Sequence, residues 1–428
     1  MRQLLKIAVI AVVVAGLSLA SFAAGLFVGQ PTMLASAESA WQFPAPPQDV
    51  DAPTQFDVFW EAWSIVQDKF VDRAALDETE LTYGAIEGML NALGDQGHTA
   101  FLTPKELEYQ RSDISGKFEG IGARIGVKDM MPMIVAPFDG SPADQAGIKA
   151  GDIILEVDGE DTQGRDLNDI VDQIRGPAGT DVVLTVLRID GEETTSLEVA
   201  ITRGTIEVPA ASWAMIPGTD VALVRLSQFS GNAVDNLKVA IREAEAAGAT
   251  ALIMDVRNNP GGLLDQAIQV TSQFLKTGNV LQEEDANGKR RPYPVRRGGI
   301  ATEIPVAVLI NAGSASSSEI FAGALQDYGR AQLVGETTFG TGTVLEPFQL
   351  KDGSALMLGT RQWLTGEGRL IRKQGITPDV ELKVPVGTDL VSTDELEEMS
   401  VDELLASEDA QLLKALELLD ALPESAQE

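Results

Sequence analysis

The chain has 428 residues, with 64 Asp and Glu against 32 Lys and Arg, one His and no Cys. The absence of cysteine excludes disulfides, thiolate-ligated metals and a thiol nucleophile, and a single histidine excludes a multi-histidine metal site. The net charge of −32 argues against a nucleic-acid partner, because phosphate backbones require a basic face. Any chemistry must use Ser, Thr, Lys, carboxylates or backbone groups, and any Ser-His pair must use His98.

The N-terminal 30 residues predict a membrane anchor. Arg2 and Lys6 precede an uncharged apolar run over 7–29, which as a helix would be about 34 Å long, enough for a bilayer core of ~30 Å. Cleavage as a signal peptide is the alternative. The two basic residues predict that the N-terminus stays inside the cell. We therefore expect a membrane-anchored, extracytoplasmic protein on the periplasmic or extracellular side, which is secreted if the segment is cleaved. Residues 31–55, rich in Pro, Ala and Ser, are typical of a linker.

Residues 56–110 are predicted to form a helical segment, because apolar residues recur there at helical spacing in two runs. These runs are Phe56, Phe59, Trp60, Trp63 and Val66, and then Ile86, Met89, Leu90 and Leu93. A glycine-containing break follows the second run, and His98 lies in it. We interpret His98 as a structural, hydrogen-bonded histidine rather than a catalytic one, since nothing nearby in the sequence resembles an oriented nucleophile.

Between residues 115 and 204 the pattern changes to short strands, glycine turns and one helix. Its markers, in order, are Gly140-Ser141-Pro142-Ala143, Gly151-Asp152-Ile153-Ile154 and Arg175-Gly176-Pro177-Ala178-Gly179-Thr180. Together they resemble a PDZ domain. A glycine-rich loop of that fold binds a peptide's C-terminal carboxylate through N–H groups, and a sheet edge takes the peptide as an added strand. The resemblance implies that the peptide-binding loop comprises Phe118, Glu119, Gly120, Ile121 and Gly122. A PDZ fold without a peptide ligand is the alternative.

Residues 205–386 predict a layered α/β domain. Buried-strand runs at 221–224 and 251–256 are separated by a helical pattern, and a third run follows at 306–310. Strand–helix–strand order implies right-handed crossovers. The remaining residues, 387–428, are acidic with Leu at helical spacing. They predict a solvated amphipathic tail that packs one face, with partner binding as the alternative.

Two strand ends in the α/β segment carry candidate site residues. The run at 251–256 stops in Asn259-Pro260-Gly261-Gly262, where glycines allow positive φ and close approach of backbone N–H groups, as an oxyanion hole needs. The run at 306–310 leads into a small-residue turn before a helix, where a serine can present its hydroxyl beside free N–H groups. A plain turn, and helix capping by Ser318 with Glu319, are the alternatives.

In combination these features resemble the carboxyl-terminal processing peptidases, also called tail-specific proteases, over about residues 56–385. The shared landmarks are Gly94-Asp95, His98-Thr99, the PDZ set, Arg257-Asn258-Asn259-Pro260-Gly261-Gly262, Gly313-Ser314-Ala315-Ser316, Gly335-Glu336-Thr337-Thr338-Phe339-Gly340 and Gly375-Ile376-Thr377-Pro378-Asp379. The resemblance implies a multidomain α+β protein: anchor, helical segment, PDZ domain and a crotonase-like (ClpP/crotonase) peptidase core. It implies Ser316 as nucleophile and oxyanion donors from Gly261, Gly262 and Ser317. It also implies protein C-termini as substrates and no metal or cofactor; the oligomeric state is open.

The sequence departs from that family at the general base. The family uses a Ser-Lys dyad, with the lysine in the motif F-G-K-G-T-V-Q and the glutamine orienting it. Here Thr341 stands at the lysine position and Leu345 at the glutamine position. A threonine hydroxyl has no basic form near neutral pH, and leucine cannot orient a partner by hydrogen bonding. Both halves of the usual base are therefore replaced.

Three functions are compatible with this departure. In the favoured one the enzyme is active and Lys373, on the return limb of the next hairpin, is the base. Its one-residue offset from the family's lysine there would turn the side chain to the other strand face. Burial, or neighbouring cations such as Arg372, would lower its pKa. An ordinary surface lysine is the alternative. In the second, the domain is an inactive pseudo-peptidase that acts as a PDZ scaffold or regulator. A crotonase-type acyl-CoA enzyme is a remote third.

Overall fold

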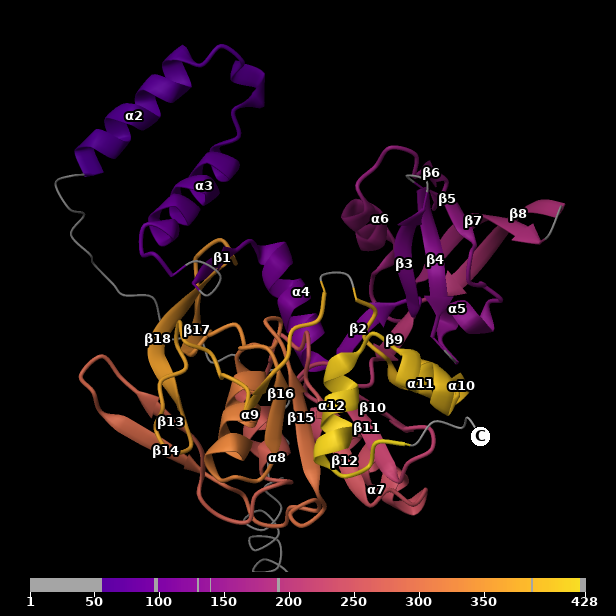
Figure 1. Ribbon diagram of the computed structural model, residues 1–428. Helices are drawn as coiled ribbons and strands as arrows, with labels where there is room; N and C mark the ends of the chain where they lie inside the picture. The colour runs from indigo at the N-terminus through magenta and orange to yellow at the C-terminus, as the bar shows by residue number, and fades with distance from the viewer. Residues whose placement is uncertain are drawn as a thin grey trace, which may run out of the picture. The chain divides into compact units, whose positions relative to one another are not determined.

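The computed structural model describes residues 56–95, 99–128, 131–138, 140–190, 193–385 and 388–423 (Figure 1). The anchor predicted over 1–30 and the linker over 31–55 lie outside these residues, and so does His98. Among the helices that are described, none combines the length and the hydropathy needed to cross a bilayer.

The N-terminal described segment is helical, as its apolar spacing predicts. Its elements are α2 (Phe56–Lys69), the short 3₁₀ helix η2 (Arg73–Ala75), α3 (Glu78–Asn91), β1 (Ala100–Leu102) and α4 (Pro104–Ser115). Helix α3 begins where it does because the Asp77 carboxylate accepts the backbone N–H groups of Thr79 and Glu80. None of the residues of α2 is buried. Strand β1 pairs antiparallel with β18 (Ala355–Thr365), far along the chain, and so fixes this segment to the C-terminal half.

The PDZ-like segment is built on one sheet with the strand order β3-β4-β5-β7-β8, and β6 pairs with β5. Its elements are β3 (Ala123–Lys128), β4 (Met131–Pro137), α5 (Pro142–Gln145), β5 (Ile153–Val157), β6 (Glu160–Asp161), α6 (Leu167–Ile174), β7 (Asp181–Asp190) and β8 (Glu193–Thr202). Aliphatic side chains such as Ile134, Ile154 and Leu184 fill its core. The chain enters this segment through β2 (Lys117–Gly120) and leaves through β9 (Gly204–Glu207), and these two strands pair antiparallel with each other.

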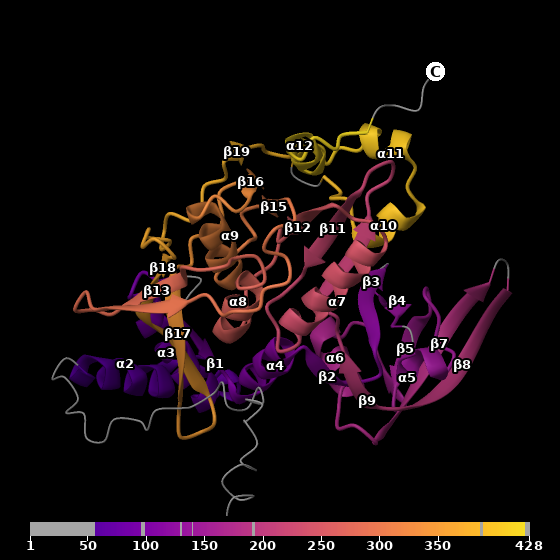
Figure 2. The same cartoon turned by 90° about the horizontal axis from the view of Figure 1, so that it is seen from below.

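The α/β segment contains a sheet of order β10-β11-β12-β15-β16-β19, parallel except for β10. Its strands are β10 (Ala211–Met215), β11 (Val221–Leu226), β12 (Ala251–Asp255), β15 (Val306–Ile310), β16 (Gln332–Gly335) and β19 (Val380–Glu381). Successive residues of β11 enter two different cores, because side chains alternate across a strand. Helices α7 (Ala233–Ala246), α8 (Leu264–Thr271) and α9 (Ser317–Asp327) contribute to one core, and side chains on both faces of the sheet are buried. Figure 2 shows the strands between α8 and α9 on one side and the C-terminal helices on the other.

The acidic C-terminal segment covers the other face of this sheet. It forms α10 (Thr393–Glu398), α11 (Val401–Ala406) and α12 (Ala410–Leu418), and α12 packs on β15 and β16. Leu412, Ala415 and Leu416 are fully buried there. The packed amphipathic face is as predicted, but the segment forms three helices that are a layer of the α/β fold, where the sequence predicts a tail with one helix or two.

A further sheet contains β13 (Asn279–Glu284), β14 (Arg290–Pro294), β17 (Thr343–Gln349) and β18, with β1 at its edge. It bears on the site because the loop that contains Thr341 leads directly into β17.

Candidate active site

Ser316 lies at the junction of β15 and α9, in a strained backbone conformation. Its φ of 53° and ψ of −112° are rarely adopted by residues other than glycine. The preceding turn is fixed by side chains: the Ser314 hydroxyl donates to the carbonyl of Val256 at 2.7 Å, and the Asn311 N–H donates to the Ser314 hydroxyl at 3.0 Å. The turn therefore holds Ser316 in a conformation that an isolated serine would avoid.

The Pro-Gly-Gly turn lies directly against Ser316. A Cβ atom at Gly261 would be 2.8 Å from the Cβ of Ser316 and 2.9 Å from the backbone nitrogen of Ser317, so no side chain fits there. The two turns meet because β12 and β15 are parallel neighbours, whose carboxyl ends lie at the same edge of the sheet. The structure thus brings together the two strand ends that the sequence singles out.

The backbone donors beside Ser316 differ in availability. The Gly261 N–H donates to the Asn259 side-chain oxygen at 2.9 Å and is occupied. The N–H groups of Gly262 and Ser317 have no acceptor among the described residues, and the Ser317 hydroxyl donates to the Gly262 carbonyl at 3.0 Å. Of the three predicted oxyanion donors, the geometry offers Gly262 and Ser317, whereas Gly261 contributes the space for close approach.

The fully buried Glu319 carboxylate connects Ser316 to the loop that contains Thr341. One oxygen accepts the Thr338 hydroxyl at 2.6 Å and the Gly340 N–H at 2.7 Å. The other accepts the N–H groups of Ser316 at 2.9 Å and Thr341 at 3.0 Å. Burial raises the pKa of the Glu319 carboxyl, and the four hydrogen bonds oppose that rise only in part. The sequence predicts only helix capping here, by Ser318 with Glu319, whereas α9 is capped at Ser316 and Glu319 also binds the Thr341 loop.

Neither Thr341 nor Leu345, at the positions where the resemblance predicts the family's base, has a basic side chain. The Thr341 side chain is buried, and Leu345 is half-buried in β17. Lys373 lies in a turn over 372–374 with φ of 59°, so the strand limb predicted for it is wrong and the argument from strand faces does not apply. Its N–H donates to the Gly340 carbonyl at 2.8 Å, which places its backbone beside the Thr341 loop. Its side chain is exposed, and the amine has no hydrogen bond or ion pair with any described residue, Ser316 included.

Comparison with known proteins decides the family. The profile of peptidase family S41 matches residues 220–382, and a PDZ domain profile matches 133–188. A carboxy-terminal-processing protease of Bartonella bacilliformis is 37% identical over 318 residues, which cover 72% of this chain and 71% of that protein. The chain belongs to the carboxy-terminal processing proteases of peptidase family S41. Two further relatives are the carboxy-terminal processing protease CtpA of Bacillus subtilis (35% identical; 78% of this chain, 70% of that one) and a carboxyl-terminal-processing protease of Synechocystis sp. (36%; 83% and 81%).

In this S41 family member the predicted PDZ loop lines a small pocket of about 200 Å³. Four of the five predicted residues contribute to it; the lining is Phe118, Gly120, Ile121, Gly122, Ala123, Ile125, Val171, Ile174 and Arg175. Glu119 does not line the pocket: its carboxylate accepts the Ala178 N–H at 3.1 Å. The Arg175 guanidinium lies over the Phe118 ring, 5.5 Å from its centroid. The pocket is mostly apolar, with one cation at its edge.

Two described residues flank the gap that contains His98. Asp95, which is buried, forms an ion pair with Arg372 and accepts the Thr99 hydroxyl at 2.8 Å. The Thr99 hydroxyl in turn accepts the N–H of Gly359 at 3.3 Å. The N-terminal segment is thus fastened to β18 and to the residue preceding Lys373.

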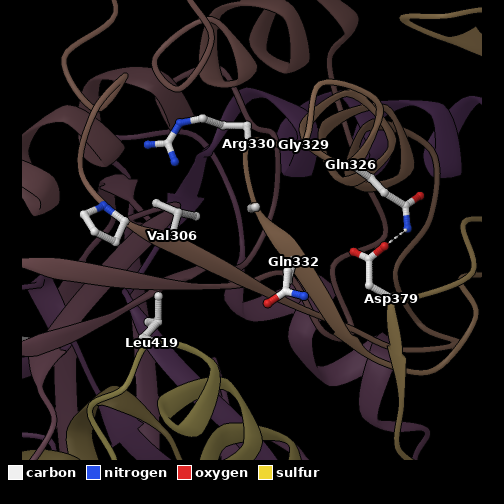
Figure 3. A pocket seen from close by; sticks show the side chains of 9 residues that line it. Val306, Gln326, Gly329, Arg330, Gln332, Asp379 and Leu419 are labelled. Atoms are coloured by element: carbon white, nitrogen blue, oxygen red, sulfur yellow. Dashed lines mark hydrogen bonds between the residues drawn. The ribbon is translucent and has the colours of Figure 1, made fainter.

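A larger hollow of about 350 Å³ lies at the other end of the parallel strands (Figure 3). It is lined by Val306 and Gln332, which begin β15 and β16, whereas Ser316 follows the carboxyl end of β15. In it the Gln326 amide donates to Asp379 at 3.0 Å, and Arg330 donates to backbone carbonyls. This hollow is separate from the candidate active site.

Proposed function

We propose that the chain is an extracytoplasmic serine endopeptidase that binds protein C-termini in its PDZ pocket and cleaves through an acyl-enzyme on Ser316. The observation that carries the proposal is the strained serine packed against Gly261, with the N–H groups of Gly262 and Ser317 open beside it. The location follows from the basic residues before the N-terminal apolar run.

In the proposed reaction the Ser316 oxygen attacks the scissile carbonyl while a base accepts the hydroxyl proton. The carbonyl oxygen becomes an oxyanion that the N–H groups of Gly262 and Ser317 stabilise. The intermediate collapses, the base returns the proton to the leaving amine, and the acyl group stays on Ser316. Water, activated by the same base, then releases it.

The proposed base is Lys373. Its support is positional, because its backbone N–H binds the carbonyl of Gly340, next to the position where the family carries its lysine. Its side chain is exposed, so in this proposal the bound substrate covers the amine. The same exposure, with threonine at 341, favours a second candidate function: a PDZ scaffold without catalysis.

The test compares the full chain with Ser316→Ala, Lys373→Ala and His98→Gln variants, using an unfolded protein substrate and a fluorophosphonate probe. Lys351→Ala is the matched control, because Lys351 is another exposed lysine in a turn. Loss of cleavage in Ser316→Ala and Lys373→Ala alone supports the proposed dyad. Loss in His98→Gln with Lys373→Ala active transfers the role of base to the histidine. If the wild-type protein binds C-terminal peptides but neither cleaves the substrate nor reacts with the probe, the result supports the PDZ scaffold without catalysis.

A further inference from the structure

Arg257 is a fully buried cation at the end of β12, just before the Pro-Gly-Gly turn. Its Nε donates to Asp255 at 3.0 Å, and its Nη2 donates to Asp255 at 2.9 Å and to Asp409 at 3.0 Å. Its Nη1 donates to Asp409 at 2.8 Å and to Gln411 at 3.2 Å. These five hydrogen bonds use all five donors of the guanidinium. Three of them end on the C-terminal segment.

The C-terminal residues that meet Arg257 are themselves held firmly. Asp409 is fully buried, caps α12 by accepting the Leu412 N–H at 3.1 Å, and accepts the Val391 N–H at 3.2 Å. The Gln411 amide donates to the carbonyl of Leu382 at 2.7 Å. Both residues lie beyond the segment that matches the S41 profile, 220–382. The guanidinium therefore depends on a part of the chain outside the matched peptidase domain.

From Arg257 the connection continues to Ser316 through two asparagines. Asn258, at φ of 56°, donates its N–H to the Asn311 side chain at 2.9 Å. The Asn259 side chain accepts the Gly261 N–H, and the Asn259 carbonyl accepts the Ala315 N–H at 3.0 Å and the Ser318 hydroxyl at 2.9 Å. A buried guanidinium that loses an anionic partner has to find water or new acceptors. Any such movement displaces the backbone that leads into the turn.

We propose that Asp409 is a positioning residue for the Pro-Gly-Gly turn. The C-terminal layer of α10–α12 then contributes to the geometry of the active site. The effect on catalysis rests on the proposed function; the effect on the turn does not. Removing the charge of Asp409 loosens residues 257–263 and misaligns the Gly262 N–H relative to Ser316. Substrate binding in the PDZ pocket is unaffected.

The experiment uses the full chain with Asp409→Asn, Gln411→Ala and the control Ser400→Ala. Asparagine keeps an oxygen that can cap α12 but removes the charge, and Gln411→Ala removes one acceptor while Asp409 stays. Ser400 caps the neighbouring helix α11, and its side chain bonds only with Glu403 among the described residues. Amide exchange across 257–263 is measured by mass spectrometry, alongside kcat, KM and binding of a C-terminal peptide.

We expect exchange across 257–263 to become at least about tenfold faster in Asp409→Asn, with a smaller change in Gln411→Ala and none in Ser400→Ala. We expect kcat to fall by about 100-fold in Asp409→Asn, as for loss of an oxyanion donor, with KM and peptide affinity within about twofold. Unchanged exchange in folded Asp409→Asn and Gln411→Ala overturns the inference. So does an equal change in Ser400→Ala, because it marks general loosening. If the wild type cleaves no substrate, the proposed function is wrong. Faster exchange in Asp409→Asn would still support the positioning role of Asp409.

Discussion

The carboxylate oxygen of Glu319 that accepts the N–H of Ser316 at 2.9 Å also accepts that of Thr341 at 3.0 Å. One buried side chain thus holds both the strained serine and the loop that contains Thr341. The hydrogen bond that holds residue 341 comes from its backbone N–H and not from its side chain.

Glu319→Gln is expected to lower stability and activity together. The amide would place an N–H₂ group against N–H donors that now meet a carboxylate oxygen, leaving buried donors unpaired at about 1–3 kcal/mol each. We expect the free energy of unfolding to fall by about 2–3 kcal/mol in urea titration, and probe labelling of Ser316 to slow at least about tenfold. Glu367→Gln, at an exposed position, is the control. Wild-type labelling rates in Glu319→Gln would contradict the role of this carboxylate.

The pH dependence of stability follows from the same residue. Burial raises the pKa of Glu319 above its ordinary value, despite its hydrogen bonds. A raised pKa in the folded state means that the stabilising contribution is present below the unfolded pKa and is lost as pH rises through the folded pKa. We expect the wild type to lose stability relative to Glu319→Gln from about pH 4 upward, in unfolding titrations at constant ionic strength. Parallel curves for the two proteins would refute the assignment.

Gly261→Ala is expected to reduce catalysis by more than backbone strain alone would. The new methyl group would lie 2.8 Å from the Cβ of Ser316, at a φ of 100°. The matched control is Gly248→Ala, because Gly248 has a φ of 104° but open space around its Cβ position. Both variants carry the strain of positive φ, about 1–2 kcal/mol. Only Gly261→Ala should lose about 100-fold or more in kcat, and equal kcat in the two variants would contradict the close approach.

Restoring the family's base provides a gain-of-function prediction. The double variant Thr341→Lys, Leu345→Gln places an amine at the end of a backbone already held by Glu319, with an amide in β17 to orient it. We expect kcat for an unfolded substrate to rise at least about tenfold, because a positioned general base contributes about 10²–10⁴-fold. Thr341→Met with Leu345→Gln controls for bulk without an amine. A methionine variant as active as the lysine variant would rule out general-base rescue.

The PDZ pocket should determine KM rather than kcat. Val171→Gln inserts a polar group into the apolar lining. Loss of about 1.5 kcal/mol of apolar burial would raise KM about tenfold for a substrate with an apolar C-terminal residue, at unchanged kcat. Val239→Gln is the control, since that valine is exposed on α7. A change in kcat without a change in KM would show that the pocket acts on the reaction rather than on binding.

The sequence predicts features that arise from local patterns of residues. It does not predict contacts between segments that are far apart in the chain. The sequence singles out the two strand ends that carry Gly261 and Ser316, and the structure places both at one sheet edge because β12 and β15 are parallel neighbours. The strand expected around Lys373 is a turn in which Lys373 has a positive φ. No periodicity in the sequence indicates such a turn. The bond from Arg257 to Asp409 spans 152 positions, so no local signal reveals it. The hydrogen bond from the Gly261 N–H to the Asn259 side chain depends on the rotamer of Asn259, which cannot be read from the sequence.

The pairing of β2 with β9 makes the PDZ segment an insertion with adjoining ends. The residues just outside it, Gly116 and Val208, are joined by a backbone hydrogen bond of 3.0 Å, so the host chain closes on itself where the insertion begins and ends. The host in turn runs from β1 to α12, on both sides of the insertion. Because the ends of the PDZ segment adjoin, the length of this segment does not affect the spacing of the host strands on either side of it. Under the proposed function, replacing this segment would change substrate preference, while the part of the molecule that contains Ser316 stays the same.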